Sequence, residues 1–145
     1  MKHKVENRVC AVFLAHSANE SLARILVSGF LMEKRLSAEE LADIKTAVSE
    51  AVTNAVVHAY RDREDGVVRL DVCLYADGRL KMTVTDKGCG IEDVERARTP
   101  FFTTDREHER SGMGFAIMET FMDRVRVTSR VGRGTRVVME KRLSV

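Results

Sequence analysis

The sequence has little of what marks secreted, fibrous or membrane proteins. Its 145 residues include one proline, no tryptophan and three widely spaced cysteines, Cys10, Cys73 and Cys89. Because no two of them form a C-x-x-C pair, we expect neither a disulfide framework nor a structural zinc site. No stretch approaches the roughly 20 apolar residues of a membrane span, and the N-terminus lacks the apolar core of a signal peptide. We therefore expect a cytoplasmic protein that makes no contact with a membrane.

The charges are nearly balanced. There are 24 lysine and arginine residues against 22 aspartate and glutamate residues, which gives a net charge of +2. This balance, without long runs of one sign, favours a protein that makes no direct contact with nucleic acid. Hydrophobic residues make up 44% and charged residues 32%, as is usual in globular chains. We expect a single domain, residues 1–145, since domains commonly have about 100–200 residues.

Local patterns predict alternating groups of strands and helices. Strands are expected at Val9–Ala15, Val67–Tyr75, Leu80–Asp86, Val125–Val131 and Thr135–Leu143. Helices are expected from the capping box Ser17/Glu20 to Phe30, from a second capping box Ser37/Glu40 over Ala38–Tyr60, and at Met113–Asp123. This order predicts an α+β two-layer sandwich, with helices on one face of a mixed β-sheet.

One stretch, residues 91–111, shows no periodicity. It contains the only proline, Pro100, together with many charged residues. A loop of this length without regular structure is usually functional, and we expect it to act as a lid.

Glu50, Asn54 and His58 recur every four residues along the long predicted helix, beside its apolar stripe. In an isolated helix such a ribbon is more often a solvated polar flank. The same pair, Glu50 and Asn54, also suits phosphoryl transfer, because an amide oxygen is a ligand for Mg²⁺ and a carboxylate accepts a proton from a hydroxyl group.

Asp86 ends a predicted strand and continues the inward phase of its apolar residues. A buried carboxylate needs hydrogen-bond donors, and the amino group of adenine is one. Gly88 and Gly90 follow, and they allow the backbone to approach a ligand closely. Taken alone, this segment equally fits an aspartate that begins a glycine-rich turn.

Two further glycine motifs follow. Residues 110–114 (Arg-Ser-Gly-Met-Gly) precede a predicted helix, whose free N–H groups favour an anion. Gly132-x-Gly134-Thr135 lies in a predicted hairpin, with Thr135 in phase with the inward apolar residues. Each motif alone is more often a plain turn.

The ordered set of these motifs resembles the Bergerat ATP-binding fold of the GHKL superfamily. Four segments narrow the resemblance to the sporulation anti-sigma F factors: VSEAVTNAVVHAY (48–60), ERSGMGFAIMETFMD (109–123), NESLAR (19–24) and PFFTT (100–104). Members of that family are serine kinases that also sequester a sigma factor. The resemblance covers nearly the whole chain, and it is least specific in the first strand and the closing hairpin.

The resemblance implies a role for each matching position. Glu50 corresponds to the base that activates a substrate serine, and Asn54 to the ligand of an Mg²⁺ ion that bridges the phosphates of ATP or ADP. Asp86 corresponds to the carboxylate that recognises adenine, supported by Thr135. The remaining positions implied to contact nucleotide are Gly88, Gly90, Gly112, Met113 and Gly114, with Thr103, Thr104, Arg110 and Ser111 in the lid. Cys89 receives no role, and Ala59 stands where the family often has glycine.

The same resemblance implies two protein partners, a sporulation sigma factor and an anti-anti-sigma protein that is phosphorylated on serine. It also implies a homodimer. Glu20 and Arg24, one helical turn apart, are expected to contact a partner, although an ordinary surface ion pair fits their spacing equally well. An alternative from another class is a binding module in which nucleotide sets the shape without phosphotransfer. A histidine-kinase catalytic domain is disfavoured, because no dimerisation helices with a phosphoacceptor histidine fit before the first strand.

Overall fold

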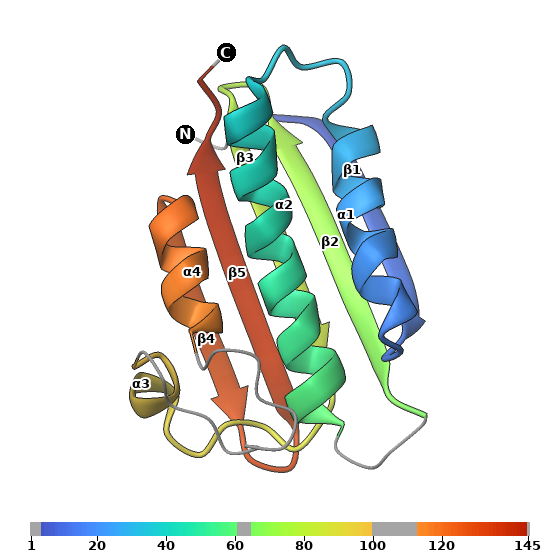
Figure 1. Ribbon diagram of the computed structural model, residues 1–145, viewed down its shortest axis with the longest axis vertical. Helices are drawn as coiled ribbons and strands as arrows, with labels where there is room; N and C mark the ends of the chain where they lie inside the picture. The colour runs from blue at the N-terminus through green and yellow to red at the C-terminus, as the bar shows by residue number, and fades with distance from the viewer. Residues whose placement is uncertain (1–3, 61–64, 100–112, 145) are drawn as a thin grey trace.

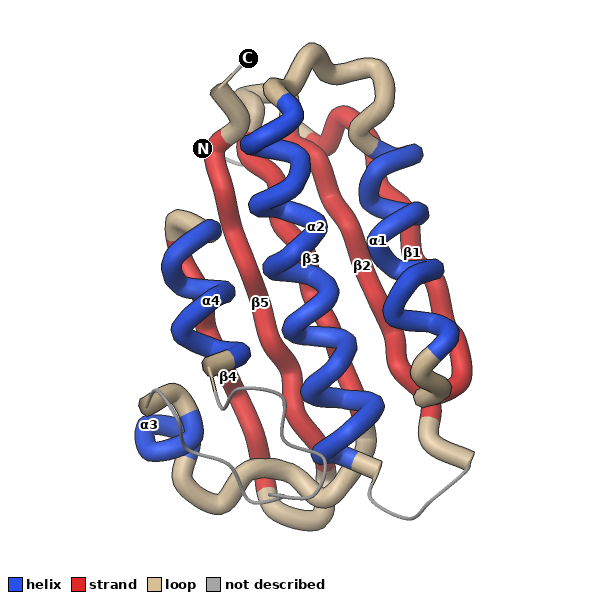
Figure 2. Tube along the Cα trace, viewed as in Figure 1, coloured by secondary structure: helices blue, strands red, loops and turns tan. Residues whose placement is uncertain are grey.

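In the computed structural model, helices cover one face of a five-stranded sheet (Figure 1; Figure 2). The structure describes residues 4–60, 65–99 and 113–144. The strands are β1 (Val5–Leu14), β2 (Val67–Tyr75), β3 (Arg79–Asp86), β4 (Arg124–Arg130) and β5 (Gly134–Arg142). The helices are α1 (Ala18–Phe30), α2 (Ala38–Thr53), α3 (Val94–Ala97) and α4 (Gly114–Phe121), and a π-helix, η1 (Asn54–Ala59), continues α2. The predicted α+β two-layer architecture is confirmed.

The sheet has the order β1-β2-β3-β5-β4, and all four neighbouring pairs are antiparallel. The expectation of a mixed sheet was therefore wrong. The crossover through α4 does make β3 and β4 run in the same direction. The closing hairpin then places β5 between them, so no parallel pair forms.

The central helix, α2, lies between α1 and α4 and supplies the core of the helix layer (Figure 1). Its predicted apolar stripe is confirmed: Ile44, Val48 and Val52 are completely buried. Ser37 caps the helix as predicted, since its Oγ accepts from the Glu40 backbone N–H at 3.0 Å. The Ser17 capping box was wrong, because the Ser17 side chain makes no cap hydrogen bond to α1.

The expected helix over Ala38–Tyr60 changes character at Asn54, where α2 gives way to the wider π-turn of η1. Tyr60 anchors the end of this segment: its hydroxyl donates to the Val67 carbonyl and accepts from the Lys87 N–H, both at 2.6 Å. Turns of this kind are rare and frequently lie at functional sites.

A short helix, α3, and the exposed apolar surface over α1 complete the described fold. Within the expected irregular stretch, α3 forms one helical turn that Asp93 caps by accepting from the Arg96 N–H at 3.1 Å. None of the helices in the described ranges has the length and apolar character needed to cross a bilayer.

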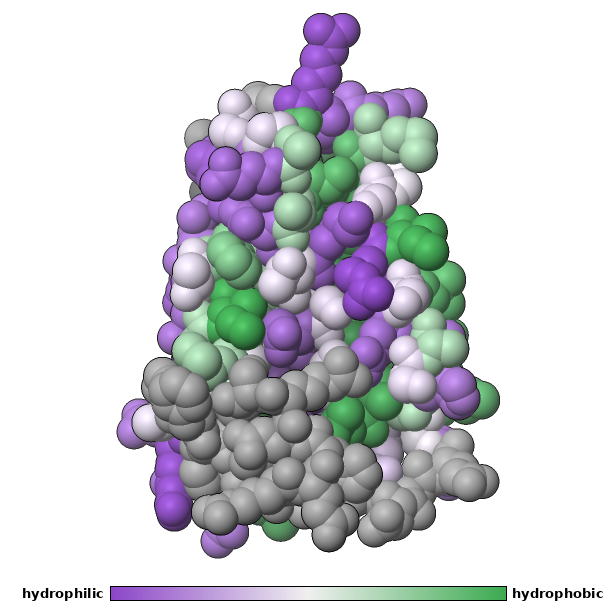
Figure 3. Space-filling model, viewed as in Figure 1, coloured by the Kyte–Doolittle hydropathy of each residue, from purple (hydrophilic) through white to green (hydrophobic). Residues whose placement is uncertain are grey.

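On the helix side of the molecule, apolar side chains are exposed over α1, among them Ile25 and Met32 (Figure 3).

Candidate nucleotide site

Glu50 and Asn54 lie one turn apart at the end of α2 and face the first residue of α4. A Cβ atom added to Gly114 would lie 3.3 Å from Glu50 Oε2 and 3.3 Å from Asn54 Oδ1. The N-terminus of α4, with its free N–H groups, therefore lies directly against a carboxylate and an amide. This contact joins two motifs that are 60 residues apart in the sequence.

One polar atom of the Asn54 side chain has no hydrogen-bond partner in the described structure. Its Nδ2 atom is buried and has no partner within the described part of the chain. Leaving such a group unsatisfied costs about 1–3 kcal/mol, so this position is suited to a bound polar ligand. The oxygens of Asn54 and Glu50 fit the preference of Mg²⁺ for hard oxygen ligands. Residues 4–60, 65–99 and 113–144 contain no cluster of three acidic, histidine or cysteine side chains that could hold a metal ion.

Asp86 forms the second part of the site. It is 8% exposed, and its Oδ1 accepts from the backbone N–H groups of Gly88 (3.0 Å) and Thr135 (3.2 Å). Both of its hydrogen bonds in the described structure end on Oδ1, which leaves Oδ2 for a ligand. Burial raises the pKa of Asp86 above its ordinary value, and the two backbone donors oppose that shift.

Thr135 lies opposite Asp86 in the β3–β5 register, a pairing that the sequence analysis did not predict. Ser129, which the sequence analysis missed, orients it. Ser129 Oγ donates to the Gly134 carbonyl at 3.0 Å and accepts from the Ile91 N–H at 2.7 Å. Because the single hydroxyl hydrogen of Ser129 is used, Thr135 donates across the 2.8 Å contact between the two hydroxyls. The sequence did contain a signal for Ser129. It follows Val125 and Val127 at two-residue steps along β4, so its side chain lies on the same face of the sheet as theirs.

Glycines in the Asp86 loop and at the start of β5 pack closely against the backbone of neighbouring segments. A Cβ atom on Gly88 would lie 2.2 Å from the Ala59 carbonyl oxygen, and one on Gly134, whose φ is +116°, would lie 2.1 Å from the Asp86 carbonyl oxygen. Cys89 N–H donates to Ala59 at 2.9 Å. These glycines allow the loop to touch the end of η1 and the β4–β5 hairpin. The expected contact of Gly88 and Gly90 with a ligand stays a prediction.

The structure brings together Glu50, Asn54 and Gly114 as one group, and Asp86, Gly88, Gly90 and Thr135 as another. Tyr60 and Ala59 link the two groups through the loop that follows β3. Met113, half-buried, directly precedes α4. The remaining lid residues, Thr103, Thr104, Arg110, Ser111 and Gly112, lie outside the described residues.

Comparison with known proteins identifies the family. Residues 13–141 match the family described as histidine kinase-like ATPase domain. The chain is 49% identical to the anti-sigma F factor of Clostridium novyi (strain NT), over 94% of this chain and 95% of the relative. It is 46% identical to that of Priestia megaterium, over 97% and 95% of the two chains. The chain belongs to the anti-sigma F factor family.

Solved structures agree on the fold of this anti-sigma F family member. The RsbU and RsbW domains of Rv1364c from Mycobacterium tuberculosis align with a TM-score of 0.68 at 23% identity, over 94% of this chain and 32% of that one. The mycobacterial sensor histidine kinase MprB aligns with a TM-score of 0.58 at 17% identity, over 93% and 98% of the two chains. These likenesses confirm the GHKL-type fold.

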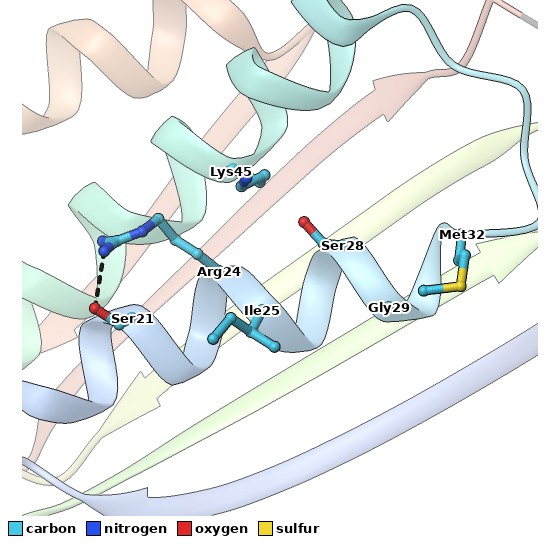
Figure 4. Close-up of a pocket in the computed structure, with 7 residues that line it drawn as sticks. All are labelled: Ser21, Arg24, Ile25, Ser28, Gly29, Met32 and Lys45. Carbon is cyan, nitrogen blue, oxygen red and sulfur yellow. Dashed lines mark hydrogen bonds between the residues drawn. The ribbon is translucent and has the colours of Figure 1, made fainter.

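The two residues of this family member expected to meet a partner lie on α1. Glu20 is only 7% exposed, so it is not the open surface carboxylate that its spacing suggested. Arg24 is half-buried and donates at 2.9 Å to Ser21 Oγ and to Ser49 Oγ of α2. Arg24 borders a groove between α1 and α2 (Figure 4). The groove is lined by Ser21, Arg24, Ile25, Ser28, Gly29, Met32 and Lys45.

Proposed function

We propose that the protein is an ATP-dependent serine kinase that also binds and inhibits a sporulation sigma factor. Its substrate is a serine of an anti-anti-sigma protein. The observation that carries the proposal is the position of Glu50: it lies one turn before Asn54 and against the N-terminus of α4, where the phosphates of a nucleotide fit. The names of the relatives at 43–49% identity support the anti-sigma role.

Nucleotide recognition rests on two acceptors at the other end of the site. Asp86 Oδ2 and the lone pairs of Thr135 Oγ1 both suit an amino donor, because the Thr135 hydrogen is directed to Ser129. Adenine carries such an amino group, whereas guanine has a carbonyl oxygen at that ring position. A solved relative in fold, ShkA, is described in complex with AMPPNP, which supports ATP or ADP as the ligand.

The chemical step needs a base and a neutralised phosphate. In the proposed reaction the serine oxygen attacks the γ-phosphorus, the bond from that phosphorus to the β,γ-bridging oxygen breaks, and ADP leaves. Glu50 takes the hydroxyl proton as the new bond forms. Asn54, together with phosphate oxygens, would hold Mg²⁺, which would supply electrostatic stabilisation of the transferred group. The chain itself contributes mainly positioning: α4 at the phosphates and the Asp86 loop at the base.

Partner binding belongs to the α1 face. Ile25 (66% exposed) and Met32 (77% exposed) line the same groove as the half-buried Arg24, a combination of apolar residues with an anchored arginine that suits a protein interface. We assign this face to the sigma factor, the anti-anti-sigma protein, or both. We also retain the homodimer as a proposal: β1 is an edge strand of the sheet, and an unpaired edge is able to pair with a second copy.

Phosphotransfer to serine separates this kinase from a module in which nucleotide only sets the shape. We expect Glu50→Gln to bind ATP and the sigma factor normally but to transfer labelled phosphate about 10²–10⁴-fold more slowly in single turnover. Glu39→Gln, an exposed change in the first turn of α2, is the matched control and should transfer at the wild-type rate. A Glu50→Gln rate within a few-fold of wild type would exclude Glu50 as the base. Absence of phosphoserine with the wild-type protein would favour the module.

A further inference from the structure

The face of the sheet that carries no helix is strongly basic. In Figure 1 the helix layer lies in front of the sheet, so this face, here called the open face, is turned away from the viewer. Strand alternation and register place nine basic side chains on it. They are Arg8 on β1, Arg69 on β2, Arg79 and Lys81 on β3, Arg124, Arg126 and Arg130 on β4, and Arg136 and Arg142 on β5.

Only two carboxylates of the strands share the open face, and both lie beneath arginines. Asp71 pairs with Arg8 at 3.0 Å and Arg69 at 2.9 Å, and its side chain is 16% exposed. Glu140 lies 3.8 Å from Arg79 and 3.9 Å from Arg126, and its side chain is 15% exposed. The positive groups therefore form the outer surface, while the negative groups are largely screened from solvent.

The near-neutral net charge conceals this separation. The described strands place nine basic and two acidic side chains on the open face. The full sequence has 24 basic and 22 acidic residues, so 15 basic and 20 acidic residues belong to the rest of the sequence. The remainder of the molecule is thus net negative. A charge distribution of this kind orients the protein toward a polyanion.

Several of these basic side chains are also unpaired. Within the described part of the chain, the side chains of Lys81, Arg124, Arg130 and Arg136 make no hydrogen bond or ion pair. They do not stabilise the fold through charge pairs of their own. Their substitution therefore tests binding without breaking an internal ion pair.

We propose that the open face binds the phosphate backbone of double-stranded DNA. Eight of its nine cations are arginines, whose forked guanidinium group pairs with phosphate oxygens bidentately. Four strand spacings of about 4.8 Å give a basic surface about 19 Å across. We choose DNA because the sigma factor proposed above as a partner acts on DNA; that choice rests on the proposed function, whereas the charge argument does not.

A protein partner fits the open face less well. The centre of a protein interface is usually apolar and depleted of charge. Here the centre contains Thr83 and Val138, both buried at 5% and 8% exposure although no helix covers them, among the surrounding long basic side chains. Exposed apolar residues on this face occur only toward its β1 edge within the described strands, at Val5, Val12, Leu14 and Val67. A second copy would bring two positive surfaces together.

Recognition of a base sequence and binding of single-stranded nucleic acid are disfavoured as well. The aromatic ring on this face, Tyr75, is covered by the Arg79 guanidinium at 4.3 Å from the ring centroid. It is therefore not open for the base stacking that single-strand binders use. We expect binding that is independent of sequence and strongly dependent on salt.

The test measures fluorescence anisotropy of a labelled duplex of about 30 base pairs while NaCl is raised from about 50 to 200 mM. The variant Arg124→Gln/Arg136→Gln removes two unpaired charges of the open face. It should weaken binding about tenfold or more at low salt and make the slope of log K against log salt shallower by about 1.8. The matched control, Lys34→Gln/Arg35→Gln, removes two charges from the loop between α1 and α2 and should retain both the wild-type affinity and slope.

Each other outcome overturns the proposal. Wild-type protein that fails to bind the duplex at low salt excludes DNA as the occupant, as does tighter binding of poly-glutamate or of single-stranded RNA. An equal loss in the control shows that overall charge, and not the open face, controls binding. If sedimentation without DNA shows a dimer that only Arg124→Gln/Arg136→Gln dissolves, the open face is an interface between copies. Nucleotide affinity of the variants is measured in parallel, so failure here is distinguishable from failure of the kinase proposal.

Discussion

Asp86 and Asp71 are two aspartates whose surroundings shift their pKa values in opposite directions. Burial is the main cause at Asp86 and raises its pKa, while the Arg69 hydrogen bond is the main cause at Asp71 and lowers its pKa. Between the ordinary value of 3.8 and the raised value, the folded protein holds the Asp86 proton more tightly than the unfolded chain does. Asp86 therefore costs stability as the pH rises through that window. Asp71 stabilises the fold above pH 3.8, and this contribution is lost as the pH falls through its lowered pKa.

This contrast gives a prediction for Asp86→Asn. The amide oxygen can retain the two backbone hydrogen bonds, but its NH₂ group then faces the adenine amino group, so affinity for ADP and ATP should fall by about 1.5–3 kcal/mol. Without nucleotide, the free energy of unfolding at neutral pH should equal or exceed that of wild type. Calorimetry with ADP and denaturant unfolding measure the two effects.

Asp71→Asn is the matched control for that experiment. It should leave ADP affinity unchanged, because Asp71 lies on the open face, and it should lower stability at neutral pH but not below the lowered pKa of Asp71. An Asp86→Asn protein with wild-type ADP affinity would remove Asp86 from the adenine site.

At the scale of elements, the junction between η1, the Asp86 loop and the β4–β5 hairpin holds the nucleotide site together. Gly88→Ala places a Cβ atom against the Ala59 carbonyl oxygen, and this oxygen cannot move without shifting η1. We expect a loss of about 1–3 kcal/mol of stability and weaker nucleotide binding. In Gly29→Ala, the added Cβ atom meets nothing within 4 Å, so this helical control should be neutral or stabilising by up to about 1 kcal/mol. Thermal unfolding with and without ATP compares the two variants.

The α1 face also allows a controlled test. Arg24→Ala should weaken binding of the sigma factor or the anti-anti-sigma protein by about 2 kcal/mol or more if Arg24 is an interface anchor. The same change removes the Ser49 hydrogen bond that braces α1 on α2. Ser49→Ala removes only that bond and keeps the guanidinium group, so it should bind partners normally. Equal losses in both variants, measured by surface plasmon resonance, would assign Arg24 a purely structural role.

At the scale of the whole molecule, the fold separates three surfaces. The proposed nucleotide site lies where α2 and β3 end and α4 begins, the proposed partner groove lies between α1 and α2, and the open face lies on the opposite side of the sheet. The first two surfaces share α2, which carries Lys45 toward the groove, Ser49 toward Arg24 and Glu50 toward the proposed phosphate position. A ligand bound at one end of α2 is thus connected to the other surface by a single helix.

Binding of nucleotide should stabilise the whole fold, since the site joins elements from the middle and the end of the chain. At an ATP concentration 100 times the Kd, the gain is about 2.7 kcal/mol, which raises Tm by about 5–10 °C. Glu50→Gln should show the full rise and Asp86→Asn little of it at the same concentration. A wild-type Tm that ATP-Mg²⁺ does not change would contradict the site as described.

Much of the architecture was predictable because it rests on short-range patterns. The apolar stripe of α2, the Ser37 cap and the bounds of β2 depend on residues near one another in the sequence, and all three are confirmed. The errors share a cause. The π-turn at Asn54 and the all-antiparallel sheet depend on contacts between distant elements, such as the Tyr60 hydroxyl with Lys87 and the insertion of β5 beside β3.

The sequence by itself determined the family and the chemical groups of the site, because Glu50, Asn54, Asp86 and Thr135 stand in motifs whose order can be recognised without coordinates. Only the tertiary structure decided how these groups meet: Gly114 against Glu50 and Asn54, and Ser129 orienting Thr135. It also decided the distribution of charge. Alternation along a strand sends neighbouring residues to opposite faces, and antiparallel register then aligns five strands, so a nearly neutral chain acquires one strongly basic side.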